Sequence, residues 1–138
     1  MDAVSRTDAL QTLLAGTDAA VYAYGVIAAR LTGAERSRAL DDMAAQRAAR
    51  DALAAQVASA GAVPTPAAAA YDLPFAVTDR TTARRLAALV EDRLAGQWAG
   101  LAGQSDAAQR TAAATSAVAC AVRQVGWSGR APVWNGSA

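Results

Sequence analysis

Apolar residues recur at alternating steps of three and four in four separate stretches of the chain, and this rhythm limits its fold more than any other feature. Such spacing places apolar side chains on one face of an α-helix. The series cover residues 10–31, 39–57, 86–101 and 115–125. The pattern predicts four amphipathic helices, with the face of the last one formed by Thr115, Val118, Val122 and Val125.

Capping residues and glycines set the expected ends of these helices. Thr78 or Asp79 can cap the third helix, and Ser105 or Asp106 the fourth, because short polar side chains accept hydrogen bonds from free N–H groups. Gly126 is the expected end of the fourth helix. The predicted helices cover about residues 5–31, 34–60, 79–103 and 105–126.

Residues 61–78 interrupt the helical pattern with three prolines, which forbid a regular helix there. A connection of this length can run along a whole bundle, whereas a helix hairpin needs only a few residues. The sequence therefore predicts an all-α domain over residues 1–138, with two antiparallel helix hairpins joined by a crossover. Residues 127–138 are expected to form a coil tail in which Trp127 and Trp134 dock on the bundle.

Composition excludes several classes of function. Thirteen basic residues, all of them arginine, balance twelve acidic ones. A nucleic-acid binder usually has a clustered basic surface, so no nucleic-acid partner is expected. The first residues lack the pattern of a secretory leader, and no apolar stretch reaches membrane-spanning length without a charge. We therefore expect a cytoplasmic protein without a membrane partner, in which the single Cys120 is a small buried apolar residue.

Four segments resemble a known family: residues 17–25, 46–53 and 71–78, and Glu91-Asp92-Arg93 with Trp98. Together they are similar to an actinobacterial, alanine-rich ferritin-like domain of unknown function (DUF4439), over about residues 9–127. The proline-containing segment 71–78 is the most specific of them. The resemblance implies a ferritin-like bundle of up-down-down-up topology without an assigned activity.

A di-iron site of the ferritin type needs a Glu from each of two helices and a Glu-x-x-His from each of the other two. This chain has no histidine. The matching positions of the second helix hold Met43 and Gln46, and those of the first hold Thr17 and Asp18, so Glu91 is the one plausible ligand. We expect no metal, no other cofactor and no enzymatic activity.

Polar residues nevertheless fall at or beside the apolar faces of three helices: Asp18, Gln46, Arg50 and Glu91. If they are buried, they need hydrogen-bond partners. One hypothesis is that Arg50 pairs with Glu91 or with Asp18 at the centre of the bundle. The alternative is that these residues lie at the solvated edge of each face.

Two functions from different classes remain open. The first is a non-enzymatic module that self-associates, as a homodimer, or binds another protein, through small-residue helix faces such as Ala45, Ala48, Ala49 and Ala52. The second is a small-ligand binder or degenerate enzyme that uses the bundle core. It predicts a cavity bounded by Thr17, Met43, Gln46, Glu91 and Val118.

Overall fold

A computed structural model describes residues 3–129 of the chain. Within this range the chain forms four helices and no strand: α1 (Ala3–Ala29), α2 (Gly33–Ser59), α3 (Arg80–Gly103) and α4 (Ala107–Ser128). Each begins and ends within a few residues of the limits expected from the sequence. The predicted position of Trp134 lies outside the described residues.

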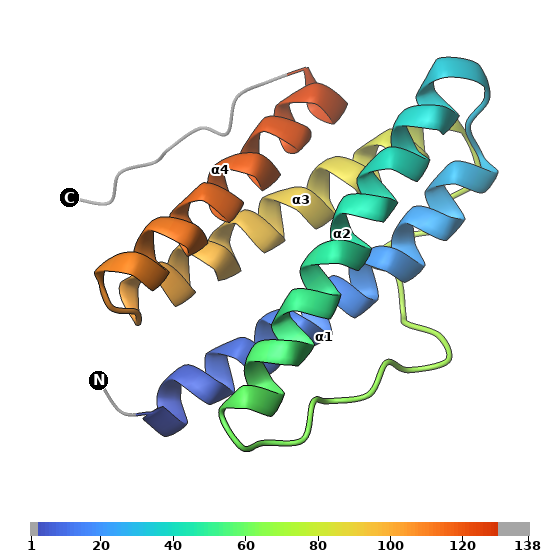
Figure 1. The fold of residues 1–138 in the computed structure, drawn as a ribbon. Helices are drawn as coiled ribbons and strands as arrows, with labels where there is room; N and C mark the ends of the chain where they lie inside the picture. The colour runs from blue at the N-terminus through green and yellow to red at the C-terminus, as the bar shows by residue number, and fades with distance from the viewer. Residues whose placement is uncertain (1–2, 130–138) are drawn as a thin grey trace.

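The four helices form an up-down-down-up bundle (Figure 1). α1 packs against α2 in one hairpin and α3 against α4 in the other, and the two hairpins meet chiefly through α1 and α3. The connection from α2 to α3 runs along the bundle from one end to the other, so that α2 and α3 point the same way. This crossover is what converts two helix hairpins into a ferritin-like arrangement.

α1 is the central apolar helix. The series that predicted it, from Leu10 to Leu31, is buried at every position, and Leu10, Tyr24 and Ile27 are 0% exposed. By length and composition this helix could also cross a membrane, and it is the one described helix that could. Within α1, half of the apolar stretch that is long enough to cross a membrane is buried inside the bundle, where its side chains pack on the other helices.

Aspartates begin α3 and α4 as the sequence predicts. Asp79 accepts a hydrogen bond from the Thr82 backbone N–H at 2.8 Å, and the Thr82 hydroxyl accepts one from the Asp79 backbone N–H at 3.1 Å. Asp106 accepts from the Gln109 backbone N–H at 3.0 Å. Each carboxylate satisfies a donor that the helix itself leaves unpaired.

The predicted end of α4 at Gly126 is wrong, because the helix continues through Trp127 to Ser128 and is capped by Gly129, whose φ of 71° favours glycine. Gly126 has another role. A side chain at this position would collide with the guanidinium of Arg38, which donates a hydrogen bond to the Gly126 carbonyl at 2.9 Å. The glycine therefore allows an arginine of α2 to reach the backbone of α4.

The predicted inner face of α4 is also wrong. Val118 and Val122 are 63% and 65% exposed, and Val125 is 37% exposed. The buried residues of α4 are Ala113, Cys120 and Trp127, spaced seven apart. This helix has apolar residues on two faces, and the face buried in the bundle is the one that carries Ala113, Cys120 and Trp127.

Candidate functional site

Glu91 lies at the centre of the bundle and is 0% exposed. Its carboxylate accepts a hydrogen bond from the Tyr24 hydroxyl at 2.7 Å and two from the Gln46 amide at 3.0 and 3.2 Å. Nε of Arg123 lies 3.0 Å from the same carboxylate and forms an ion pair with it. A buried carboxylate needs such partners, because its transfer from water is costly.

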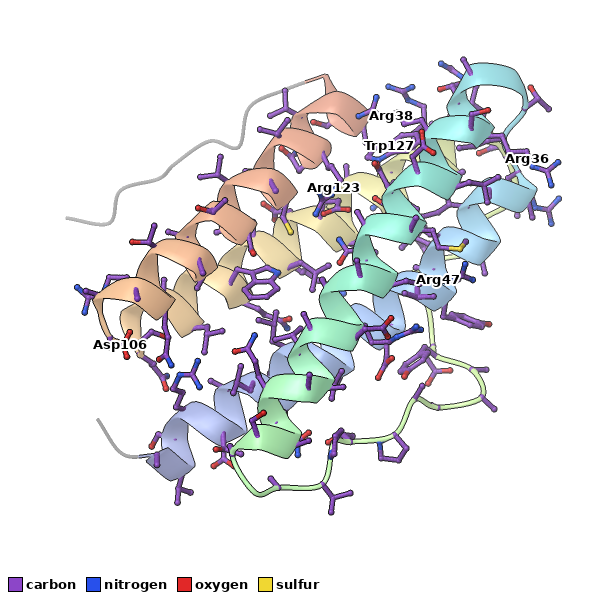
Figure 2. All side chains as sticks on the ribbon, in the orientation of Figure 1. Arg36, Arg38, Arg47, Asp106, Arg123 and Trp127 are labelled. Atoms are coloured by element: carbon purple, nitrogen blue, oxygen red, sulfur yellow. The ribbon has the colours of Figure 1, made fainter. Side chains whose placement is uncertain are left out.

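Each of the four helices contributes one residue to this cluster: Tyr24 from α1, Gln46 from α2, Glu91 from α3 and Arg123 from α4. The first three lie within the apolar series that predicted their helices or directly beside it, so their burial follows from the helical period. Arg123 lies between α4 and α2 and reaches inward from α4 (Figure 2). We call these four residues the central cluster.

The Glu91 carboxylate and burial shift the pKa values of the ionisable groups beside it. Burial, and then the charge of Glu91, raises the pKa of the Tyr24 hydroxyl far above its ordinary value, so Tyr24 remains a donor. Burial lowers the pKa of Arg123, but the charge and hydrogen bond of Glu91, together with Cys120 and Tyr24, raise it overall above its ordinary value. Burial and Glu91 raise the pKa of Cys120 to about 12. Cys120 is therefore a neutral thiol, which receives an Arg123 N–H at 3.4 Å.

The structure brings together two of the four residues expected to share a polar cluster, Gln46 and Glu91. The predicted pairing of Arg50 with Glu91 or Asp18 is wrong. Arg50 is half-buried, with a side chain 32% exposed, and pairs at 3.1 Å with its neighbour Asp51, whose side chain is 72% exposed. The cation in contact with Glu91 is Arg123. Its position was not predicted, because the series of valines in α4 indicated a different side of the helix as the inner face.

Asp18 is 6% exposed and lies outside the central cluster. Burial raises the pKa of its carboxyl above the ordinary value of 3.8, the charge of Arg50 lowers it and that of Asp51 raises it. In the folded state the charged form of Asp18 is therefore disfavoured overall. The unfolded chain escapes this penalty, since its carboxyl is fully hydrated.

We therefore expect Asp18→Asn to increase the free energy of unfolding at neutral pH. As the pH falls through the raised pKa of Asp18, the wild-type folded state takes up a proton and the advantage of the variant should disappear. Urea unfolding of both proteins from pH 7 down to pH 3 measures the difference. A constant difference over this range would show that burial of the charge is not its cause.

The donor set of the bundle centre does not fit a di-iron site. In the described part of the chain, residues 3–129, the buried carboxylates are Glu91 and Asp18, of which Asp18 lies outside the central cluster, and the chain has no histidine. Among residues 3–129 no group of three or more His, Cys, Asp or Glu side chains could hold a metal ion. The Glu91 carboxylate is, moreover, already bonded to a guanidinium, so an incoming metal cation would have to displace Arg123.

The predicted core cavity is not formed by the residues named for it. Val118 is exposed on the outside of α4, whereas Glu91 and Gln46 are buried and bonded to each other. A hollow of about 220 Å³ lies elsewhere, between α1, α3 and the crossover, and alanines of α1 and leucines of α3 form much of its lining.

A second cluster of polar contacts surrounds Trp127, which is 1% exposed near the end of α4 (Figure 2). Its indole N–H donates to Asp42 at 2.8 Å, and Arg38 lies over its ring at 4.4 Å from the centroid. Arg84 donates to the Trp127 carbonyl at 2.9 Å and pairs with Glu35. These arginines of α2 and α3 satisfy carbonyls that the end of a helix leaves unpaired.

Comparisons with known proteins agree with this fold. A conserved hypothetical protein from Mycobacterium tuberculosis is 27% identical, with a TM-score of 0.88 over 92% of this chain and 97% of that one. A ferritin-like, diiron-carboxylate protein from Bacillus anthracis is similar in fold at 16% identity, with a TM-score of 0.70 over 91% and 93% of the two chains. No curated protein matches the sequence. Residues 9–136 match the family described as "Domain of unknown function (DUF4439)", and the chain therefore belongs to this family, with a ferritin-like fold.

Proposed function

We propose that this protein is a non-enzymatic helical module that acts by self-association through the exposed apolar face of α4. The observation that carries the proposal is the exposure of Val118, Val122 and Val125 along one side of a helix whose opposite side is packed on the bundle. Contiguous exposed apolar side chains on a folded domain are typical of association sites.

The identity of these residues strengthens the proposal. Valine and threonine are poorer helix formers than alanine, which this chain uses at exposed helix positions such as Ala45 and Ala48. Val118 and Val122, which are 63% and 65% exposed, therefore cost helix stability with little gain from burial in the isolated bundle. Burial against a partner would supply that gain, because each valine side chain removes more apolar surface from water than alanine does.

The central cluster supports a role without chemistry at the bundle centre. Its carboxylate is held by three side chains from three other helices, so it has a structural explanation that needs no substrate. The alanine face of α2 remains the competing association surface. There Ala45, Ala48 and Ala52 are exposed, and Ala49 packs partly on the core.

Sedimentation equilibrium tests the proposal with two matched variants, Val122→Arg on α4 and Ala48→Arg on α2. Both place a charged, helix-forming side chain at an exposed position, so both should remain folded. We expect the wild type and Ala48→Arg to dimerise and Val122→Arg to remain monomeric. Loss of the dimer in Ala48→Arg alone would move the interface to α2. A wild type that stays monomeric up to about 1 mM would refute self-association.

A further inference from the structure

A second hollow of about 220 Å³ lies between α2 and α4, near the end of the bundle where α1 begins (Figure 1). We call this space the α2–α4 hollow. The two helices line it chiefly with alanines: Ala49 and Ala52 of α2, and Ala112 and Ala113 of α4. Because alanine has no side-chain atom beyond Cβ, neither helix fills the space between them.

Two core residues of α3, Trp98 and Leu101, also line the α2–α4 hollow. The tryptophan offers a flat apolar surface on which another ring can pack. A cavity of about 150 Å³ with apolar walls can take up benzene, so the larger hollow has room for one ring with a small substituent. It is open to solvent, since three of its lining residues are exposed: Gln56, Gln109 and Ala112.

Arg6 is the one charged residue among the described residues that line this hollow. Within residues 3–129 it has no carboxylate partner, and its one hydrogen bond is a long one, from Nη2 to the side-chain oxygen of Gln56 at 3.4 Å. Its Nε is buried without an acceptor. Three other half-buried arginines each form an ion pair with a carboxylate: Arg50, Arg84 and Arg123. Arg6 thus lacks the anion that a partly desolvated guanidinium needs.

We infer that the α2–α4 hollow binds a small aryl carboxylate, with its ring against Trp98 and its carboxylate on the guanidinium of Arg6. The ring suits the apolar lining, and the carboxylate supplies the missing anion. Guanidinium and carboxylate form charge-assisted hydrogen bonds that fix orientation as well as adding affinity. The site shares no residue with the central cluster or with the exposed valines of α4, so the inference goes beyond the proposed self-association.

Other ligand classes match this lining less well. A metal cation would find no carboxylate, histidine or cysteine among the described residues that line the hollow. A wholly apolar molecule would leave the Arg6 guanidinium without an anion. Inorganic phosphate or sulfate would pair with Arg6 but would make no use of the apolar surface of Trp98 and Leu101. A molecule with one ring and one carboxylate matches both parts of the site.

Titration with phenylacetate tests the inference, with phenylacetamide as the neutral molecule of the same shape. The readout is the indole N–H signal of Trp98 in ¹H–¹⁵N spectra, identified by its absence from Trp98→Phe. We expect phenylacetate to shift this signal with a Kd of about 1 mM, a reasonable affinity for about ten non-hydrogen atoms. Phenylacetamide should bind about tenfold more weakly, because it cannot form the charge-assisted bonds to Arg6.

Three variants locate the ligand. Arg6→Gln removes the charge but keeps a helix-forming side chain, and it should weaken phenylacetate binding about tenfold without changing phenylacetamide binding. Arg93→Gln is the matched control, because Arg93 is exposed and lines the other hollow, between α1, α3 and the crossover. Ala112→Leu should abolish binding of both molecules by filling the α2–α4 hollow. Circular dichroism checks that each variant keeps its helices.

Several outcomes would overturn the inference. One is an unshifted Trp98 signal at about 20 mM phenylacetate, and another is equal affinity of the wild type for phenylacetate and phenylacetamide. Equal shifts with sodium acetate would show that any carboxylate binds and that the ring contributes nothing. Loss of binding in Arg93→Gln but not in Arg6→Gln would place the ligand in the other hollow. Sedimentation of Val122→Arg tests the proposed self-association separately, so the two can fail independently.

Discussion

Replacement of Arg123 by alanine should lower the free energy of unfolding by about 3 kcal/mol, a value at the lower end of those found when one partner of a buried ion pair is removed. The Arg123 side chain is 23% exposed, but Glu91 is fully buried and would lose the guanidinium that is bonded to it. Tyr24 and Gln46 donate hydrogen bonds to Glu91 but carry no positive charge. Urea unfolding followed by circular dichroism measures the loss.

Arg50→Ala is the matched control, because it removes an arginine that pairs with a surface carboxylate. We expect this change to cost less than about 1 kcal/mol. Part of this cost arises because the charge of Arg50 also stabilises the buried Asp18 carboxylate. The double variant Glu91→Met with Arg123→Met should recover much of the loss, since apolar residues of similar size can replace a buried ion pair. Equal effects of Arg123→Ala and Arg50→Ala would show that the ion pair contributes little to stability.

Trp127→Ala should also destabilise the protein strongly, by about 3–5 kcal/mol, because it removes a large buried ring and leaves a cavity. The ring joins α4 to the rest of the bundle through its hydrogen bond to Asp42 and its contact with Arg38. Without it, the C-terminal turns of α4 lose their main apolar contact. Thermal and urea unfolding report the global loss, and hydrogen exchange of residues 121–128 should become faster than that of α1.

Trp127→Phe separates packing from hydrogen bonding at this position. It keeps an aromatic ring under Arg38 but removes the N–H that Asp42 accepts. We expect a loss of about 1–3 kcal/mol, the range for a buried polar group left without its partner, together with a smaller packing loss. If phenylalanine and alanine destabilise equally, the hydrogen bond to Asp42, rather than the ring, holds the end of α4.

Three helices show how far local pattern determines the fold. In α1 every residue of the predicted apolar series is buried, and in α2 five of the six are, with Arg50 at the edge. Gln46 lies within an apolar series and Glu91 directly beside one, so the helical period offered two positions for each: the interior, where both lie, or the solvated edge, where Arg50 lies. The helical period alone indicates which side chains share the apolar face, whatever the other helices are.

α4 shows where that reasoning ends. Its valines form a good apolar series, and the chain contains a second, weaker one in Ala113, Cys120 and Trp127. The weaker series is the one that packs. Its seven-residue spacing and its tryptophan were the available signal, but small residues count little in any hydrophobicity pattern. Because this face is the buried one, Arg123, which lies beside it on the helix, is close enough to pair with Glu91.

By itself, then, the sequence determined the four helices, their order in two hairpins and the crossover between them, because helical period, capping residues and prolines act within a few residues of each other. It also identified Glu91 as the one plausible ligand-type carboxylate in a chain without histidine. Only the tertiary structure decided which face of α4 is inside, and with it the partner of Glu91 and the exposure of the valines. That choice depends on how well each face fits α3, which is a property of two surfaces rather than of one segment.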